Sequence, residues 1–171
     1  VRMRESLIMD AIYRYSGAFE CSVVDANAEE PDSSEIIMEG GDIIIAREDV
    51  LIVGNGVRTT PQGIDFIVDR LCRCNPEARM NVIVQQLPSQ PESFIHLDMV
   101  FTLLDKDKCM IFKPLIMRAN QYQTVHIVIE GGKVSSIRPV AGLLPALRSL
   151  GMDLKPLVCG GDDDWDQERE Q

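Results

Sequence analysis

The hydrophobic residues of the chain follow two different spacings, and their alternation predicts a mixed α/β fold. Hydrophobic residues three and four positions apart predict helices at 4–19, 61–73 and 143–150. Short runs rich in β-branched residues predict strands between these helices. The predicted strands are 21–24, 35–46, 50–53, 82–84, 96–104, 109–112, 125–130, 134–137 and 157–159.

The order strand, turn, strand, helix, strand occurs about twice, which predicts a repeat architecture. Consecutive βαβ units are the weaker alternative, because they would show longer helices and fewer hairpins. We expect one domain over 1–171, in which 25–34 is an acidic loop and 162–171 is an acidic C-terminal segment. In such a repeat, polar groups from successive units converge on a common axis.

The apolar run 94–101 is unusual because it contains one imidazole and one carboxylate. If the run is a strand, His96 and Asp98 point to the same face. By itself this indicates no more than a satisfied His–Asp pair on a half-exposed strand. A second apolar run, 36–45, carries Glu39 and Asp42. Because the two runs open similar units, we expect their polar side chains to form one pocket.

Two kinds of site fit these side chains. Glu39, Asp42 and Asp98 could supply the oxygen ligands of a Mg²⁺ or Ca²⁺ ion. Alternatively, Glu39 and Asp98 could accept the fixed fork of N–H donors of a guanidinium, with His96 transferring protons. A histidine-rich zinc site is not expected, because the other histidine, His126, falls in a different strand pattern.

The composition narrows the classes of partner. The chain has 27 acidic and 17 basic residues, and its net charge is −10. This charge argues against nucleic acid or an anionic membrane as the main partner, and a cationic small molecule fits it better. No apolar run approaches the about 18 residues of a membrane span, and no signal peptide is visible. Five irregularly spaced cysteines indicate unpaired thiols in a reducing cytoplasm.

The loop after the strand at 50–53 is rich in glycine but does not match a nucleotide site. Gly54-Asn55-Gly56 has two glycines and no Lys-Ser or Lys-Thr after them, so a P-loop is excluded and a dinucleotide fingerprint fails. We expect a turn that ends the strand. Arg58 follows this turn, and it is either an exposed arginine or an anchor for a substrate carboxylate.

Three motifs stand in the order and approximate spacing of the arginine deiminase family, which the chain resembles over nearly its whole length. They are Met38-Glu39-Gly40-Gly41-Asp42-Ile43, Gly54-Asn55-Gly56-Val57-Arg58-Thr59 and His96-Leu97-Asp98-Met99-Val100-Phe101. Two further segments resemble the family less closely. They are Arg2-Met3-Arg4-Glu5, which leads a helix, and Gly160-Gly161-Asp162-Asp163 with 167–171 after it.

The resemblance implies a fold and a reaction. The family belongs to the guanidine-modifying, amidinotransferase-like superfamily, whose pentein-like α/β propeller has five ββαβ units around a pseudo-fivefold axis. This chain would supply several of the five blades. The family hydrolyses L-arginine to L-citrulline and ammonia in arginine catabolism, and it uses no metal or other cofactor.

The resemblance also implies roles for individual residues. His96 would be the general acid and base, and Glu39 and Asp98 would bind the substrate guanidinium. Arg58, together with Arg4, would bind the substrate carboxylate. The remaining motif residue, Asp42, would support its loop by hydrogen bonds to the backbone.

The chain departs from the family pattern at the nucleophile. The family's nucleophilic cysteine lies in a glycine-rich C-terminal segment, and another guanidinium-binding Asp lies upstream, but neither segment occurs here. Cys159 ends an apolar strand, so we expect it to be a buried small hydrophobic residue. The chain is therefore expected to be a piece of a longer protein. We expect no turnover by this piece, because it has no thiolate to attack the guanidinium carbon.

Other functions stay open on this reasoning. The substrate could be another guanidine, such as agmatine or a methylated arginine, although the carboxylate partner at Arg58 favours arginine. The chain could also be a non-catalytic guanidinium-binding subunit or pseudoenzyme, so whether it is an enzyme is undecided. A propeller with missing blades has exposed strand edges, which leads us to expect association into a homo-oligomer.

Overall fold

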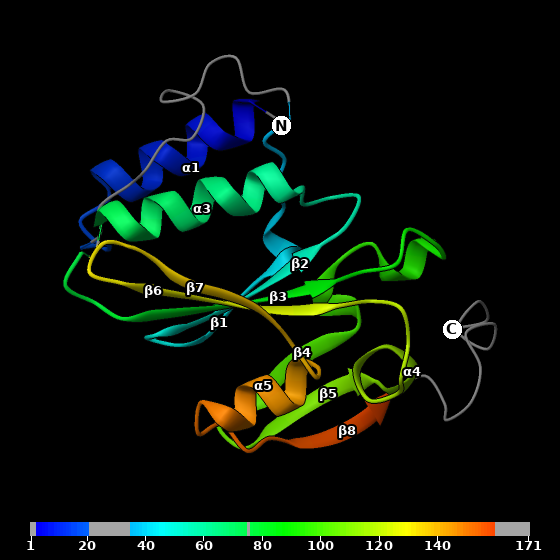
Figure 1. The fold of residues 1–171 in the computed structure, drawn as a ribbon. Helices are drawn as coiled ribbons and strands as arrows, with labels where there is room; N and C mark the ends of the chain where they lie inside the picture. Colours follow the sequence, from blue (N-terminus) through cyan, green and yellow to red (C-terminus); the bar gives the residue numbers. More distant parts are fainter. Residues whose placement is uncertain (1–2, 21–34, 75, 160–171) are drawn as a thin grey trace.

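The structure, a computed structural model, describes residues 3–20, 35–74 and 76–159. The strands in these ranges form a five-stranded sheet of order β1-β2-β3-β6-β7 and a three-stranded sheet of order β4-β5-β8 (Figure 1). The strands are β1 (Ile43–Arg47), β2 (Val50–Asn55), β3 (Met80–Gln86), β4 (Phe101–Asp105), β5 (Lys108–Phe112), β6 (Thr124–Glu130), β7 (Lys133–Val140) and β8 (Lys155–Cys159). The α-helices are α1 (Met3–Tyr15), α3 (Pro61–Cys74), α4 (Lys113–Ile116) and α5 (Leu143–Ser149).

Each sheet contains the same ββαβ unit, so the predicted repeat is present. β1 and β2 pair antiparallel, and β3 returns parallel to β2 after α3. β4, β5 and β8 repeat this arrangement, with α5 before β8. Equivalent hydrogen bonds recur as well. The Asn81 amide donates to the Asp49 carbonyl at 2.8 Å, and the Lys155 amide donates to the Asp107 carbonyl at 2.7 Å.

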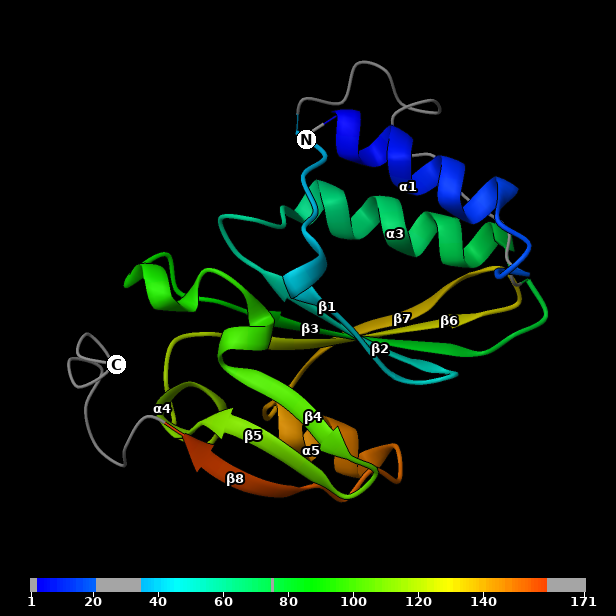
Figure 2. The same ribbon diagram turned by 180° about the vertical axis from the view of Figure 1, so that it is seen from behind.

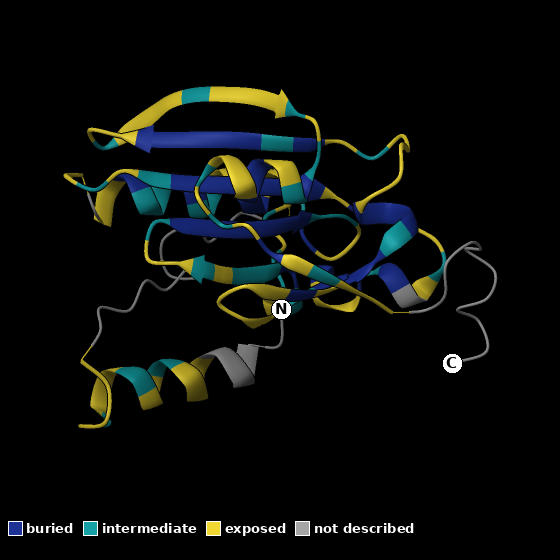
Figure 3. Ribbon diagram, turned by 90° about the horizontal axis from the view of Figure 1, so that it is seen from below, coloured by how far each residue is buried: buried dark blue, intermediate teal, exposed yellow. Residues whose placement is uncertain are grey.

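The hairpin β6–β7 interrupts the second unit and extends the first sheet. β6 pairs antiparallel with β3, and β7 pairs antiparallel with β6. β7 is exposed over most of its length, as the outer strand of the five-stranded sheet (Figure 3). The predicted hairpin at 125–137 is therefore confirmed, and it does not belong to either ββαβ unit.

β2 is apolar from Val50 to Gly54 because both of its faces are buried there. Leu51 and Val53 belong to a core under α3, whereas Val50 and Ile52 belong to the core shared with the second sheet and α5. Figure 1 shows the same layering, with α3 on one side of the five-stranded sheet and α5 with the three-stranded sheet on the other. The core that contains Val50 and Ile52 holds the two units face to face, whereas the core under α3 attaches that helix to the five-stranded sheet.

Most predicted elements are confirmed within a few residues, and α1 ends at Tyr15 instead of Phe19. The predicted strand 21–24 and the acidic segments 25–34 and 162–171 lie outside the described residues. The described residues form two open sheets and no closed barrel. None of the helices within the described ranges is long and apolar enough to cross a membrane.

The two strands expected to carry the polar residues are wrong in part. β4 begins only at Phe101, and His96 and Asp98 precede it, because residues 97–99 form the 3₁₀ helix η3 (Leu97–Met99). Likewise, β1 begins at Ile43, after the 3₁₀ helix η1 (Gly40–Asp42). The physical reason is pairing: β5 pairs with β4 only from Phe101 onward, so the preceding backbone bonds to itself.

Candidate active site

The candidate site forms where the 3₁₀ helices of the two units lie against each other (Figure 2). Glu39 is the N-cap residue of η1, and His96 is the N-cap residue of η3. Their backbones are nearly identical, with φ and ψ of −124° and 146° at Glu39 and of −126° and 152° at His96. The repeat therefore brings two equivalent positions together.

The side chains of these two residues are hydrogen-bonded. His96 Nε2 lies 2.8 Å from Glu39 Oε2, and both side chains remain partly open to solvent, at 23% and 39% exposure. Arg58, from the loop between β2 and α3, donates from Nη1 to the other oxygen, Glu39 Oε1, at 3.3 Å. The Glu39 carboxylate thus has an imidazole on one oxygen and a guanidinium on the other.

These neighbours stabilise the ionised form of Glu39. The hydrogen bond from His96 is the largest influence, and it lowers the pKa of the Glu39 carboxyl below its ordinary value of 4.5. Partial burial opposes this effect, and the positive charge of Arg58 adds to it. Glu39 is therefore a carboxylate at neutral pH, which is the form that accepts guanidinium N–H donors.

Asp42 lies beneath this pair and is completely buried. Its Oδ1 accepts a hydrogen bond from the Leu97 amide at 2.9 Å, and its Oδ2 accepts one from the Thr59 hydroxyl at 2.6 Å. Burial raises the pKa of the Asp42 carboxyl, and the two hydrogen bonds oppose that rise. Asp42 belongs to the first unit and Leu97 to the second, so the carboxylate joins the two units.

Asp98 and His96 flank one glycine. A Cβ atom added to Gly41 would lie 3.0 Å from His96 Cγ and 3.1 Å from Asp98 Oδ2. The exposed Asp98 side chain therefore lies beside the pair formed by Glu39 and His96, over the backbone of η1. A side chain at the second glycine of the Gly40-Gly41 motif would therefore press against both His96 and Asp98.

The sequence did not indicate that Thr59 and Gly54 support the buried carboxylate of Asp42. Thr59 is buried and bonded to Asp42, although the motif that contains it drew attention only to Arg58. A Cβ atom at Gly54 would lie 2.7 Å from Asp42 Oδ1, so this glycine makes room for the buried carboxylate. Thr59 is distinguished only by its burial and its hydrogen bond to Asp42, and neither property is readable from one sequence.

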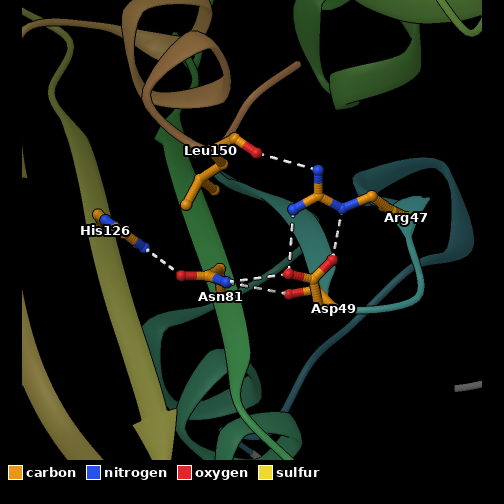
Figure 4. A network of polar contacts seen from close by, with 5 residues as sticks. All are labelled: Arg47, Asp49, Asn81, His126 and Leu150. Carbon is orange, nitrogen blue, oxygen red and sulfur yellow. Dashed lines mark hydrogen bonds and ion pairs between the residues drawn. The ribbon is translucent and has the colours of Figure 1, made fainter.

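Arg4, which was predicted to bind the substrate carboxylate, is not placed in the site, and the second histidine of the chain, His126, lies elsewhere. The side chain of Arg4 lies outside the described part of the structure, although its backbone belongs to α1. His126 is buried in β6, where its Nε2 lies 2.9 Å from Asn81 Oδ1 (Figure 4). Asn81 in turn donates to Asp49, which pairs with Arg47. His126 therefore belongs to a polar network around the β1–β2 turn.

The oxygen-ligand metal site considered for Glu39, Asp42 and Asp98 does not form. Among the described residues, no group of three or more His, Cys, Asp or Glu side chains is arranged to hold a metal ion. Both oxygens of Asp42 are already hydrogen-bonded within the protein. Glu39 instead pairs with His96 and Arg58, so these side chains match guanidinium recognition better than metal binding.

The thiols described by the structure are free, and they differ in exposure. Cys72 and Cys109 are buried, and burial raises the pKa of both thiols. Cys74 and Cys159 are exposed. The expected burial of Cys159 is wrong, because β8 is an edge strand that leaves this residue open to solvent. Cys159 and Asp98 line the same small cavity of about 40 Å³.

Comparison with known proteins identifies the family. The family model for arginine deiminase matches residues 1–171. The chain belongs to the arginine deiminase family. An arginine deiminase from Mycoplasma capricolum subsp. capricolum (strain California kid) is 31% identical over 170 residues. This alignment covers 99% of the present chain and 41% of the relative, so the chain spans less than half of that protein's length.

The three motifs that resemble the arginine deiminase family are the segments that build the site. The first contains η1 with Glu39 and Asp42, the second contains Arg58 and Thr59, and the third contains η3 with His96 before it. Although the motifs are far apart in the sequence, the hydrogen bonds at Glu39 and Asp42 join all three of them. The family resemblance found in the sequence is confirmed.

Proposed function

We propose that this chain forms part of an enzyme that hydrolyses L-arginine to L-citrulline and ammonia. The observation that carries the proposal is the environment of the Glu39 carboxylate. One of its oxygens accepts a hydrogen bond from the guanidinium of Arg58, and the other lies beside the imidazole of His96. A substrate guanidinium presents the same N–H donors as Arg58 does. Membership of the arginine deiminase family supports arginine as the substrate.

In the proposed reaction, Glu39 and Asp98 bind the substrate guanidinium. Arg58 leaves Glu39 and binds the substrate carboxylate, together with Arg4. His96 acts as the general acid and base: it gives a proton to the departing ammonia and then takes one from the attacking water. The oxygen of that water replaces one guanidinium nitrogen, which yields citrulline. This assignment needs neither metal nor another cofactor.

We further propose that the nucleophile is a cysteine outside this chain and that the 171 residues alone are inactive. Its thiolate attacks the guanidinium carbon, ammonia leaves, and water then cleaves the covalent intermediate. The raised pKa values of the Cys72 and Cys109 thiols support this proposal, because a buried neutral thiol is a poor nucleophile. Cys159 is the exposed thiol beside Asp98, and it needs a direct test.

We also propose the pentein-like propeller for the whole protein. Two successive ββαβ units that meet at their polar turns support it, because further units of the same kind would surround the same site. Exposed Leu157 and Val158 on the edge strand β8 support packing against another blade or another subunit. Free thiols support a cytoplasmic location.

The test is a citrulline assay with L-arginine on this chain and on a version extended at both ends from the parent gene. We expect citrulline from the extended protein and none from the 171 residues. Citrulline from neither version contradicts the proposed function. Citrulline from the short chain contradicts the external nucleophile, and loss of that activity in Cys159→Ser, with Cys74→Ser as the matched control, would identify the thiol responsible.

A further inference from the structure

We propose that Thr59 is a positioning residue, whose hydroxyl sets the backbone of Glu39 against the turn that carries His96. The inference concerns geometry, and it rests on the proposed function only for its effect on turnover. The roles assigned above use Glu39 and His96 as chemical groups, but they do not explain how two side chains from different units are held at hydrogen-bonding distance.

A continuous path of hydrogen bonds provides the explanation. The Glu39 amide donates to Thr59 Oγ1 at 3.2 Å, and Thr59 Oγ1 donates to Asp42 Oδ2 at 2.6 Å. The Leu97 amide donates to Asp42 Oδ1 at 2.9 Å. Leu97 directly follows His96, so the path runs from the backbone of Glu39 in the first unit to the backbone beside His96 in the second.

The single proton of the Thr59 hydroxyl fixes which group donates and which accepts along this path. A threonine hydroxyl has one proton, and because Oγ1 accepts from the Glu39 amide, its own proton is directed to Asp42. Thr59 and Asp42 are both fully buried, so no solvent is available to replace a lost bond. Removal of the hydroxyl would leave the Glu39 amide and one Asp42 oxygen without this partner, and the turn with Glu39 would shift.

The adjacent threonine provides a matched contrast. Thr60 Oγ1 donates to the Glu35 carbonyl at 2.6 Å and accepts from the Gly63 amide at 3.1 Å, in the first turn of α3. Its hydroxyl therefore caps a helix and anchors the segment before η1. The two hydroxyls are neighbours in the sequence, but only the hydroxyl of Thr59 is bonded to Asp42.

The experiment compares Thr59→Val, Thr59→Ser and Thr60→Val in the 171-residue chain by NMR titration of the Glu39 carboxyl. We expect Thr59→Val to move the Glu39 pKa back toward 4.5, because Glu39 no longer faces His96 correctly. Thr59→Ser, which restores the hydroxyl, should keep the wild-type value. Thr60→Val should also keep it, while its melting temperature falls.

The same variants in the extended protein give a second readout. For L-arginine we expect kcat/KM of Thr59→Val to fall by about 10- to 100-fold, because small displacements of groups that bind and orient the substrate have effects of this size. Thr59→Ser should stay within about twofold of wild type. If the wild-type extended protein forms no citrulline, the proposed function fails, and the NMR titration alone decides the role of Thr59.

Three results would overturn the inference. The first is a folded Thr59→Val variant with the wild-type Glu39 pKa, and the second is a Thr60→Val variant that changes this pKa equally. The third result needs no variant and concerns the exchange of the Thr59 hydroxyl proton with solvent. In the wild-type chain we expect this proton to exchange slowly and to give a resolved NMR signal. Exchange as fast as that of an exposed threonine would contradict the buried hydrogen bond to Asp42, even if Thr59→Val fails to fold.

Discussion

Glu39 and His96 occupy equivalent positions in two successive ββαβ units, and their side chains meet at 2.8 Å. Neither unit could form this pair alone, because each contributes one partner. The pair therefore forms only when the two units pack against each other. Both partners stand at the start of their unit, directly before the 3₁₀ helix that precedes its first strand.

The first prediction concerns the pKa of Glu39. Because the hydrogen bond from His96 lowers this pKa more than Arg58 does, His96→Ala should raise it further than Arg58→Ala. NMR titration of the Glu39 carboxyl measures both effects. A larger rise in Arg58→Ala would show that the guanidinium, not the imidazole, is the main partner of Glu39.

The second prediction uses the two adjacent glycines of the first motif. Gly41→Ala would place a methyl group against His96 and Asp98, whereas Gly40→Ala would meet no atom within 4 Å. Both side chains are at the surface and can move aside, so we expect Gly41→Ala to fold but to displace His96. Its kcat in the extended protein should fall by about 10- to 100-fold. Gly40→Ala is the control, and equal kcat values in the two variants would refute the prediction.

The third prediction concerns stability. A methyl group at Gly54 would lie 2.7 Å from Asp42 Oδ1 and 2.9 Å from Leu87 Cδ1, inside a packed core. Gly54→Ala should therefore lower the free energy of unfolding by about 1–3 kcal/mol. Urea denaturation measures the change, and Gly56→Ala, for which the nearest contact is 3.3 Å, should cost less. Equal losses in the two variants would show that the close approach to Asp42 is not the cause.

The fourth prediction concerns pH. Burial, together with the charges of Arg138 and Arg79, lowers the pKa of His126 below its ordinary value of 6.5. Below pH 6.5 the unfolded chain therefore takes up a proton that the folded chain does not, and stability falls as the pH drops from 6.5 toward the folded pKa. His126→Gln keeps a donor for Asn81 and should lose less melting temperature between pH 7.5 and 5.5. An equal loss in both proteins would rule out His126 as the source.

The fifth prediction tests the substrate carboxylate. In the extended protein, Arg58→Ala should raise KM for L-arginine by at least about tenfold, because removal of a charge-assisted hydrogen bond costs about 1.5–3 kcal/mol. Agmatine has no carboxylate, so its binding should change less. Isothermal titration or inhibition by each compound measures the difference. Equal losses for the two compounds would remove Arg58 from the carboxylate role.

The elements predicted from the sequence were accurate where local pattern determines structure. The hydrophobic residues of α3 recur on one face, and the apolar run of β2 matches a strand buried on both sides. The prediction failed at 96–100, where an apolar run was taken for a strand. An apolar composition indicates burial, but it does not indicate whether a partner strand is present, and β5 pairs only from Phe101 onward.

By itself, the sequence determined the α/β class, the repeated ββαβ order and the family, and it singled out the polar residues that we propose for the site. These features depend on local spacing and on short motifs. Only the tertiary structure decided that His96 pairs with Glu39 across 57 residues, that Thr59 and Asp42 link the two turns, and that Cys159 is exposed. Such contacts depend on how two units pack, because hydrogen bonds between distant residues form only after the cores have placed their backbones side by side.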